Sequence, residues 1–251
     1  MARTDLLLVE RGLAPSRSAA QRLIARGAVR WRSPAGWAAP RKSGDDLPDD
    51  CELRIDDDAE LRYVSRGGLK LEGALAHSGI DVRTLACLDL GQSTGGFTDC
   101  LLHAGAERVV GVDVGHGQLH ESLRADPRVR ALEGVNVRTL DAATLGDAFP
   151  PRGFDLVVAD LSFISLAHAF APAFALVRTG GQLLALVKPQ FELGPGAVDR
   201  RGVVRDGERH GELRARIEAS ARGSGWTPED WFDSPIAGGD GNREFFVAAR
   251  K

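Results

Sequence analysis

Cysteine is scarce in this sequence, and its arrangement suggests neither a disulfide framework nor a metal site. The three cysteines, Cys51, Cys87 and Cys100, are odd in number and lack the spacing of metal ligands, which is typical of a reducing compartment. His116 and His120 stand four residues apart, as two ligands on one helix face would, but no third ligand accompanies them. We therefore expect no metal centre.

Long apolar segments are missing too. The sequence has no run of about 18 apolar residues, so it predicts no membrane-spanning helix. Its first ten residues are interrupted by Arg3, Asp5 and Glu10 and lack the layout of a secretion signal. We expect a globular protein of the cytoplasm, in agreement with a composition of 43% hydrophobic and 27% charged residues.

Charge is distributed unevenly along the 251 residues. Residues 1–44 contain nine basic and two acidic side chains, a net charge of +7, so the overall charge of −3 leaves −10 for the remainder. A basic segment joined to an acidic body favours a polyanionic partner for that segment. An ordinary solvated basic face is the alternative interpretation of the charge.

The first part of the chain has the pattern of a small α+β domain. Ser16 or Ser18 can cap its second helix, and Gly27 ends that helix. The expected elements are helices at residues 5–10 and 18–25, strands at 28–31 and 52–55, and a loop rich in proline, glycine and charge at 33–50. The predicted division of the chain is a small domain at 1–58, a linker at 59–66 and a larger domain at 67–251.

From residue 85 onward, short apolar strands alternate with helical patterns. Strands are predicted at residues 86–90, 109–114, 130–133, 156–159, 181–187 and 244–248, and helices at 97–103 and 164–176. This alternation predicts an α/β fold with a parallel, doubly wound sheet. Ligands of such sheets bind at the carboxyl ends of the strands.

A glycine-rich loop follows the first strand of this sheet and leads into a helix. Asp113 ends the next strand, 22 residues after Gly91, where an acidic residue can accept hydrogen bonds from a ribose. The loop predicts a nucleoside-containing cofactor. Ser93 occupies the position at which the dinucleotide pattern has its second glycine, and this favours S-adenosylmethionine over NAD.

Four polar residues stand at strand ends or at the entrance to the larger domain: Lys70, Asp160, Lys188 and Glu244. A lysine beside the cofactor crevice can act as the general base for a ribose hydroxyl or orient that hydroxyl for attack on a methyl group. The alternative is purely structural. In it Asp160 caps the following helix, and Lys188 and Glu244 form an ion pair at the edge of the sheet.

Six motifs, in this order, closely resemble the TlyA family of ribosomal RNA methyltransferases, long called hemolysins. They are YVSRGGLKL at residues 63–71, GQSTGGFTD at 91–99, VDVGHGQL at 112–119, DLSFISL at 160–166, VKPQFE at 187–192 and GNREF at 241–245. The larger domain also resembles FtsJ-type 2′-O-methyltransferases. Residues 6–13, 16–17, 21–24 and 27–29 resemble an RNA-binding domain shared by a small-subunit ribosomal protein and many pseudouridine synthases.

The resemblance implies a Rossmann-like fold and S-adenosylmethionine-dependent 2′-O-methylation of cytidine in 16S or 23S ribosomal RNA. It implies Lys188 as the base, with Lys70 and Glu244 positioning the ribose and Asp160 orienting Lys188 or the methyl group. The implied cofactor-binding residues are Asp89, Gly91, Ser93, Gly95, Gly96, Phe97, Asp113, Asn136 and Asp160. The expected RNA-binding residues are Arg3, Arg11, Arg17, Arg22, Arg26 and Arg66.

The partners implied are ribosomal RNA or ribosomal subunits and no membrane, and we expect a monomer or a weak dimer. The sequence departs from the family at Gln92, His116 and Arg243 and lacks the Asn-Gly hairpin of the RNA-binding domain. Trp31 and Trp37 can stack on bases or pack in the small domain. Residues 194–206, with Arg200, Arg201 and Arg205, suggest an RNA-facing flap or an ordinary surface loop. A membrane-active hemolysin and an RNA-binding assembly factor without catalysis are the competing functions.

Overall fold

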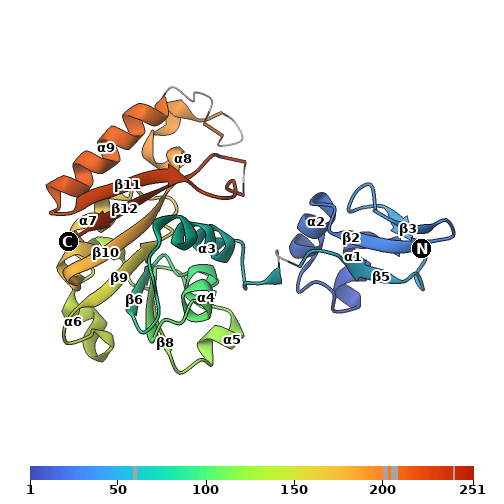
Figure 1. Cartoon of the computed structure of the whole chain (residues 1–251), viewed down its shortest axis with the longest axis horizontal. Coiled ribbons are helices and arrows are strands. Elements are labelled where there is room, and N and C mark those ends of the chain that lie inside the picture. Colours follow the sequence, from blue (N-terminus) through green and yellow to red (C-terminus); the bar gives the residue numbers. More distant parts are fainter. Residues whose placement is uncertain (59–60, 200–202, 205–208, 240) are drawn as a thin grey trace. The chain divides into compact units, whose positions relative to one another are not determined.

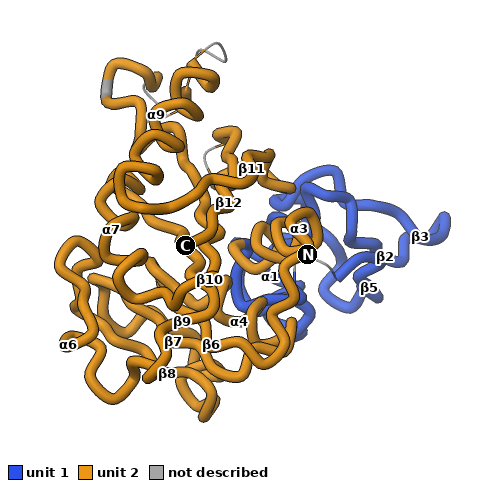
Figure 2. The backbone as a smooth tube through the Cα atoms, turned by 60° about the vertical axis from the view of Figure 1, so that its left-hand side comes forward, with its two compact units in different colours: residues 1–66 blue, residues 67–251 orange. Residues whose placement is uncertain are grey.

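A computed structural model describes residues 1–58, 61–199, 203–204, 209–239 and 241–251 of the chain. The chain divides into two compact units, Met1–Arg66 and Gly67–Lys251 (Figure 2). Arg200, Arg201 and Arg205, which the sequence suggested for a flap, lie outside the described residues.

The first unit contains the two predicted helices packed on a small antiparallel sheet. Ser16 caps α2, where its hydroxyl accepts a hydrogen bond from the Ala19 amide, and Leu23 and Val29 are fully buried in the core. The elements are β1 (Ala2–Arg3), α1 (Thr4–Glu10), α2 (Arg17–Ala25), β2 (Val29–Ser33), β3 (Gly36–Ala38), β4 (Asp46–Leu47) and β5 (Leu53–Ile55).

Two of these strands lie in the segment that was predicted to be a loop. β3 pairs with β2 and completes a sheet of order β3-β2-β5, and β4 pairs with β1. The prediction of a loop over residues 33–50 was therefore wrong at these strands. Strands of two or three residues are stabilised by pairing with distant segments, which local composition does not reveal.

The second unit is built on a seven-stranded sheet of order β11-β12-β10-β9-β6-β7-β8 (Figure 1). The strands are β6 (Ala86–Leu90), β7 (Arg108–Asp113), β8 (Val129–Glu133), β9 (Phe154–Ala159), β10 (Val177–Val187), β11 (Thr227–Asp233) and β12 (Phe245–Arg250). The α/β fold is confirmed, and β10, β9, β6, β7 and β8 are parallel neighbours. The sheet is mostly parallel, and its β12 runs antiparallel to both β10 and β11.

Helices cover both faces of the sheet. Phe245 and Phe246 are adjacent on β12 and therefore point to opposite faces. Phe245 belongs to the core that also holds Phe170 of α7 and Ile217 of α9, whereas Phe246 stacks on Phe97 of α4. The α-helices are α3 (Gly67–Ser78), α4 (Gly96–His103), α5 (Glu121–Arg124), α6 (Ala142–Leu145), α7 (Ala167–Leu176), α8 (Pro189–Glu192) and α9 (Arg209–Gly223). Short 3-10 turns are η2 (Val137–Thr139), η3 (Gly146–Ala148) and η4 (Pro195–Ala197).

Within the described residues, no helix has the length and apolar character needed to cross a membrane. The same part of the chain contains no group of three or more histidine, cysteine or carboxylate side chains arranged to hold a metal ion. Cys51, Cys87 and Cys100 are free thiols and are buried.

Candidate active site

The carboxyl edge of the sheet brings together three of the four polar residues predicted to be catalytic. Asp160 directly follows β9, and Lys188 directly follows β10. Glu244 directly precedes β12, and because β12 runs antiparallel to β10, its beginning lies at the same edge. Val187 pairs with Phe245, so Lys188 and Glu244 are the next residues on neighbouring strands.

Two ion pairs connect the four residues. Lys188 Nζ lies 2.6 Å from Asp160 Oδ1, and Lys70 Nζ of α3 lies 2.6 Å from Glu244 Oε2. The alternative interpretation, an ion pair between Lys188 and Glu244, is therefore wrong. Asp160 also does not cap α7, since that helix begins at Ala167 and its N-cap residue is Leu166, which provides no side-chain cap.

The two pairs differ in their exposure to solvent. The Lys70 and Glu244 side chains are 9% and 2% exposed, so this pair is buried. The Lys188 and Asp160 side chains remain 11% and 22% exposed. Lys188 also donates a hydrogen bond to the hydroxyl of Ser162, at 2.9 Å. The two lysines are similarly covered, and the pairs differ at their carboxylates, because Asp160 reaches solvent and Glu244 does not.

A cavity of about 520 Å³ opens beside Asp160 and Ser162. Its volume is in the range of small-molecule sites. Its wall is formed by segments that follow four neighbouring parallel strands, β6, β7, β8 and β9. The lining residues are Gly91, Ser93, Val112, Asp113, Val114, Gly115, Gln118, Val135, Asn136, Val137, Arg138, Asp160, Leu161, Ser162, Phe163 and Ile164.

Five of the nine predicted cofactor-binding residues line this cavity: Gly91, Ser93, Asp113, Asn136 and Asp160. Gly91 has a φ of +83°, and a Cβ there would come within 2.7 Å of the Asp160 carbonyl oxygen. Glycine is thus required where the β6 loop crosses the end of β9. The other four, Asp89, Gly95, Gly96 and Phe97, are buried and do not line the cavity.

Asp113 is held in place by the backbone of the loops around it. Its Oδ2 accepts a hydrogen bond from the Ser93 amide at 2.8 Å, and its Oδ1 accepts one from the Gly115 amide at 2.7 Å. A carboxylate oxygen has a second lone pair, so both oxygens can still accept from ligand hydroxyls. The Asn136 side-chain oxygen accepts from the Arg138 amide at 3.0 Å, which leaves its NH₂ group as a donor.

A buried polar chain lies beneath the cofactor loop. The Thr98 hydroxyl donates to Asp89 Oδ2 at 2.7 Å, and Gln92 Nε2 donates to the Thr98 hydroxyl at 2.9 Å. Burial raises the pKa of Asp89 to about 7. Gln92, which departs from the family, fills the space over Gly111, where a Cβ would overlap its amide. This departure has a structural reason.

The comparisons with known proteins agree with this architecture. Residues 63–251 match the FtsJ-like methyltransferase family. This chain belongs to that family. The 16S/23S rRNA (cytidine-2′-O)-methyltransferase TlyA of Mycobacterium tuberculosis is 43% identical over 249 residues, covering 99% of this chain and 90% of that protein. Hemolysin A of Brachyspira hyodysenteriae is 35% identical, with 98% of both chains covered.

A solved structure from Streptococcus thermophilus covers 99% of this chain and 88% of its own, with a TM-score of 0.75 and 38% identity. As a member of the FtsJ-like family, this chain is an S-adenosylmethionine-dependent methyltransferase. The cavity fits that cofactor. The carboxylate oxygens of Asp113 are able to accept from ribose hydroxyls, and a negative charge in the cavity wall suits a positively charged cofactor.

Several cavity residues were not singled out from the sequence, among them Ser162, Phe163 and Arg138. Phe163 is 90% exposed and adopts a φ of +63°, a strained conformation for a bulky residue. The centre of its ring lies 5.0 Å from the centre of the Phe191 ring. These residues could have been found from their position in the sequence, because they come shortly after predicted strands whose carboxyl ends were expected to hold the ligand.

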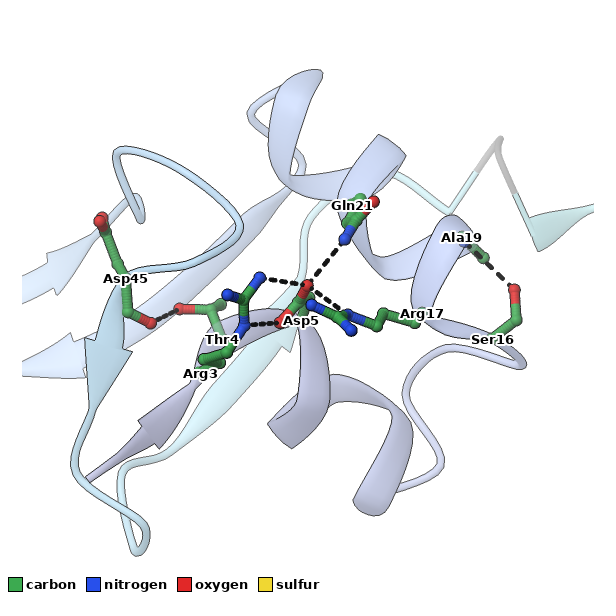
Figure 3. A network of polar contacts seen from close by, with 8 residues as sticks. All are labelled: Arg3, Thr4, Asp5, Ser16, Arg17, Ala19, Gln21 and Asp45. Atoms are coloured by element: carbon green, nitrogen blue, oxygen red, sulfur yellow. Dashed lines mark hydrogen bonds and ion pairs between the residues drawn. The ribbon is translucent and has the colours of Figure 1, made fainter. Parts of the chain in front are cut away.

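Arg3, Arg11 and Arg17, which were expected to bind RNA, make hydrogen bonds within the first unit. Asp5 is fully buried and accepts hydrogen bonds from Arg3, Arg17 and Gln21 (Figure 3). The Arg3 guanidinium is the main reason that the pKa of Asp5 lies well below its usual range. Arg11 donates to the carbonyl oxygens of Cys51 and Asp49.

The other three expected RNA-binding residues also belong to the first unit. Arg22 is on α2, Arg26 is the exposed residue that ends it, and Arg66 is half-buried at the end of the unit. RNA binding by all six arginines stays a prediction.

Proposed function

We propose that this methyltransferase transfers a methyl group to the 2′-hydroxyl of a cytidine in ribosomal RNA. The observation that carries the proposal is the Lys188–Asp160 ion pair at the mouth of a cofactor-sized cavity. The proposal is also supported by the 43% identical TlyA protein, which is named as a 16S/23S rRNA (cytidine-2′-O)-methyltransferase. The +7 charge of residues 1–44 gives the first unit the sign that an RNA backbone attracts.

S-adenosylmethionine, when bound, supplies an electrophilic methyl group on a sulfonium. The residues of this chain prepare the other reactant. Lys188, once it has released its own proton to solvent, orients the ribose 2′-oxygen and accepts the hydroxyl proton as the carbon–oxygen bond forms. The carbon–sulfur bond of the methyl donor is the bond that would break, leaving S-adenosylhomocysteine. Asp160, 2.6 Å away, stabilises the resulting ammonium, because a neighbouring negative charge favours the protonated form of lysine.

The Lys70–Glu244 pair has a different role from the Lys188–Asp160 pair. Lys70 and Glu244 are buried and mutually neutralised, so neither is placed to exchange protons with solvent. Glu244 adjoins Lys188 across the β10–β12 pair. We assign to Lys70 and Glu244 the positioning of the ribose against Lys188. Asp113 and Asn136 hold the nucleoside part of the cofactor.

The experiment is transfer of labelled methyl from S-adenosylmethionine to ribosomal subunits that lack the modification. The full-length protein is compared with Lys188→Ala and with Arg83→Ala, an exposed control residue on the surface of the same unit. Wild type and Arg83→Ala are expected to yield 2′-O-methylcytidine, and Lys188→Ala to lose at least about 100-fold in rate. Full activity of Lys188→Ala would remove that residue from the mechanism.

The same preparation tests the competing functions. Cofactor and RNA binding without methyl transfer to any ribosomal RNA would favour a non-catalytic assembly factor. Release of dye from liposomes at nanomolar protein would favour membrane lysis, the activity named for the Brachyspira relative. A ribosomal RNA substrate requires the cytoplasmic location predicted from the sequence. Sedimentation of the free protein tests the expected monomer or weak dimer.

A further inference from the structure

A second bridge connects the two loops that carry Asp160 and Lys188, and none of the predicted catalytic residues is part of it. Its centre is Glu192, the last residue of the short helix α8, which is only 6% exposed. Glu192 Oε1 accepts a hydrogen bond from the Leu166 amide at 2.6 Å, and Oε2 accepts one from the Ser165 hydroxyl at 2.8 Å.

Helix α9 also contacts Glu192. Arg216 of α9 donates to the main-chain oxygen of Glu192 and reaches Oε2 at 3.3 Å. A buried carboxylate that accepts three donors is costly to disturb, because removing it leaves those donors without partners. The position of α8 is therefore fixed against both the start of α7 and the middle of α9.

Glu192 lies close in the chain to Lys188, and two of its partners lie close in the chain to Asp160. α8 begins directly after Lys188, and the segment containing Ser165 and Leu166 begins directly after Asp160. The loops after β9 and β10 are thus joined twice, once by the Lys188–Asp160 pair beside the cavity and once by Glu192 behind it. Any shift of α8 would carry Lys188 away from Asp160 and from Ser162.

We propose that Glu192 is a positioning residue for methyl transfer, which holds Lys188 Nζ at its working distance from Asp160 and Ser162. The inference rests on the proposed role of Lys188. It predicts that loss of Glu192 lowers kcat and leaves cofactor binding unchanged, because the cavity wall does not include Glu192. A misplacement of about 1 Å can cost about 100-fold in rate.

The chain provides a matched control at the opposite edge of the same sheet. Asp155 of β9 accepts from Arg178 at 2.6 Å and from the Ala86 amide at 2.9 Å, so it also joins separate strands through a carboxylate. It is remote from Lys188, since it stands near the beginning of β9 and not after its end. Asp155→Ala therefore reports what general loosening of the fold does to activity.

The kinetic test uses full-length Glu192→Ala, Glu192→Gln and Asp155→Ala with unmodified ribosomal subunits and labelled S-adenosylmethionine. Glu192→Ala is expected to lower kcat about 10- to 100-fold, with the Kd for S-adenosylmethionine within about twofold of wild type. Glu192→Gln should recover most of the rate, because its amide oxygen still accepts from Leu166. Equal losses in Glu192→Ala and Asp155→Ala would overturn the inference.

A second readout needs neither RNA nor catalysis. The chain has four lysines, Lys42, Lys70, Lys188 and Lys251, so labelling lysine at the ε-carbon gives four resolvable NMR signals. Glu192→Ala, or Arg216→Ala if Glu192→Ala folds poorly, should move the Lys188 signal and leave that of Lys70 in place, whereas Glu192→Gln should leave both signals near their wild-type positions. An unmoved Lys188 signal overturns the positioning role. A moved signal in a protein whose wild type transfers no methyl would support the positioning and refute the proposed function.

Discussion

Lys188 and Asp160 face each other across the ends of two parallel strands, with Nζ and Oδ1 2.6 Å apart. Lys188 directs a hydrogen bond at Ser162, so its ammonium group is held from two sides. Asp160 also lines the cofactor cavity. The proposed base, Lys188, is thereby linked to the cavity through the Asp160 carboxylate.

Replacing Asp160 by asparagine should lower the rate of methyl transfer about 100-fold or more. The asparagine keeps the shape of the side chain but no longer stabilises the ammonium form of Lys188. Single-turnover rates with saturating S-adenosylmethionine measure the effect. A variant with wild-type rate at saturation would show that the carboxylate charge does not act on Lys188.

The Lys70–Glu244 pair is expected to behave as one buried unit in stability. Lys70→Met leaves the Glu244 carboxylate buried without its partner and should destabilise the protein by about 3–5 kcal/mol. The double variant Lys70→Met, Glu244→Leu should be more stable than Lys70→Met alone. Urea unfolding of Lys70→Met, Glu244→Leu and the double variant beside wild type measures the coupling, and additive losses would contradict it.

Asp113 should affect cofactor binding more than catalysis. Asp113→Ala removes the acceptor proposed for the ribose and frees the Ser93 and Gly115 amides that order the loop. We expect a loss of about 10- to 100-fold in affinity for S-adenosylmethionine, since hydrogen bonds to a charged group contribute about 1.5–3 kcal/mol. Titration calorimetry measures it. Unchanged affinity would mean that the ribose of the cofactor does not bind at Asp113.

The raised pKa of Asp89 leads us to expect that the folded protein loses stability as the pH rises. Burial raises the pKa of this carboxyl from 3.8 to about 7 in the folded protein. Between these values the unfolded chain has released a proton that the folded chain retains, so each rise in pH favours unfolding. The contribution is fully present below pH 3.8 and is lost as the pH passes 7.

Asp89→Asn should therefore flatten the dependence of unfolding free energy on pH over that window. Urea unfolding at pH 5, 6, 7 and 8 compares the slopes of the two proteins. Asp147→Asn, at an exposed carboxylate of the same unit, is the control. An identical slope for Asp89→Asn and wild type would mean that Asp89 titrates normally.

The two tryptophans of the first unit should separate stability from RNA binding. Trp31 packs against the core beside Leu7 and Leu47. Trp37 pairs with Arg32 on β2, and the Arg54 guanidinium lies 4.3 Å from its ring centre. Trp37→Ala is expected to weaken binding to ribosomal RNA, because aromatic and cationic groups together hold RNA bases.

Trp31→Ala should instead destabilise the unit, since it removes a large apolar side chain from a core. Filter binding at several salt concentrations measures RNA affinity, and thermal unfolding measures stability. If Trp37→Ala binds RNA as wild type does at every salt concentration, the outer face of β2 and β3 is not part of the RNA surface.

Much of the sheet could be predicted because its strands are short, apolar and buried. β6 occupies the predicted residues 86–90, and five other predicted strands are present with ends shifted by a few residues. β11 was missed because Thr227–Asp233 is a mostly polar edge strand without clear alternation. α9 was missed because only Leu213, Ile217 and Ala221 of its 15 residues are buried.

The sequence by itself determined the order of the motifs, the glycine needed at residue 91 and the division of charge between the two parts of the chain. It also supplied all four ionisable residues of the proposed centre. Only the tertiary structure decided which lysine pairs with which carboxylate. Lys70 and Glu244 are 174 residues apart, and the antiparallel direction of β12 is what brings Glu244 to the edge where Asp160 and Lys188 lie. Local periodicity indicates that a strand forms, but its direction is set by packing between distant segments.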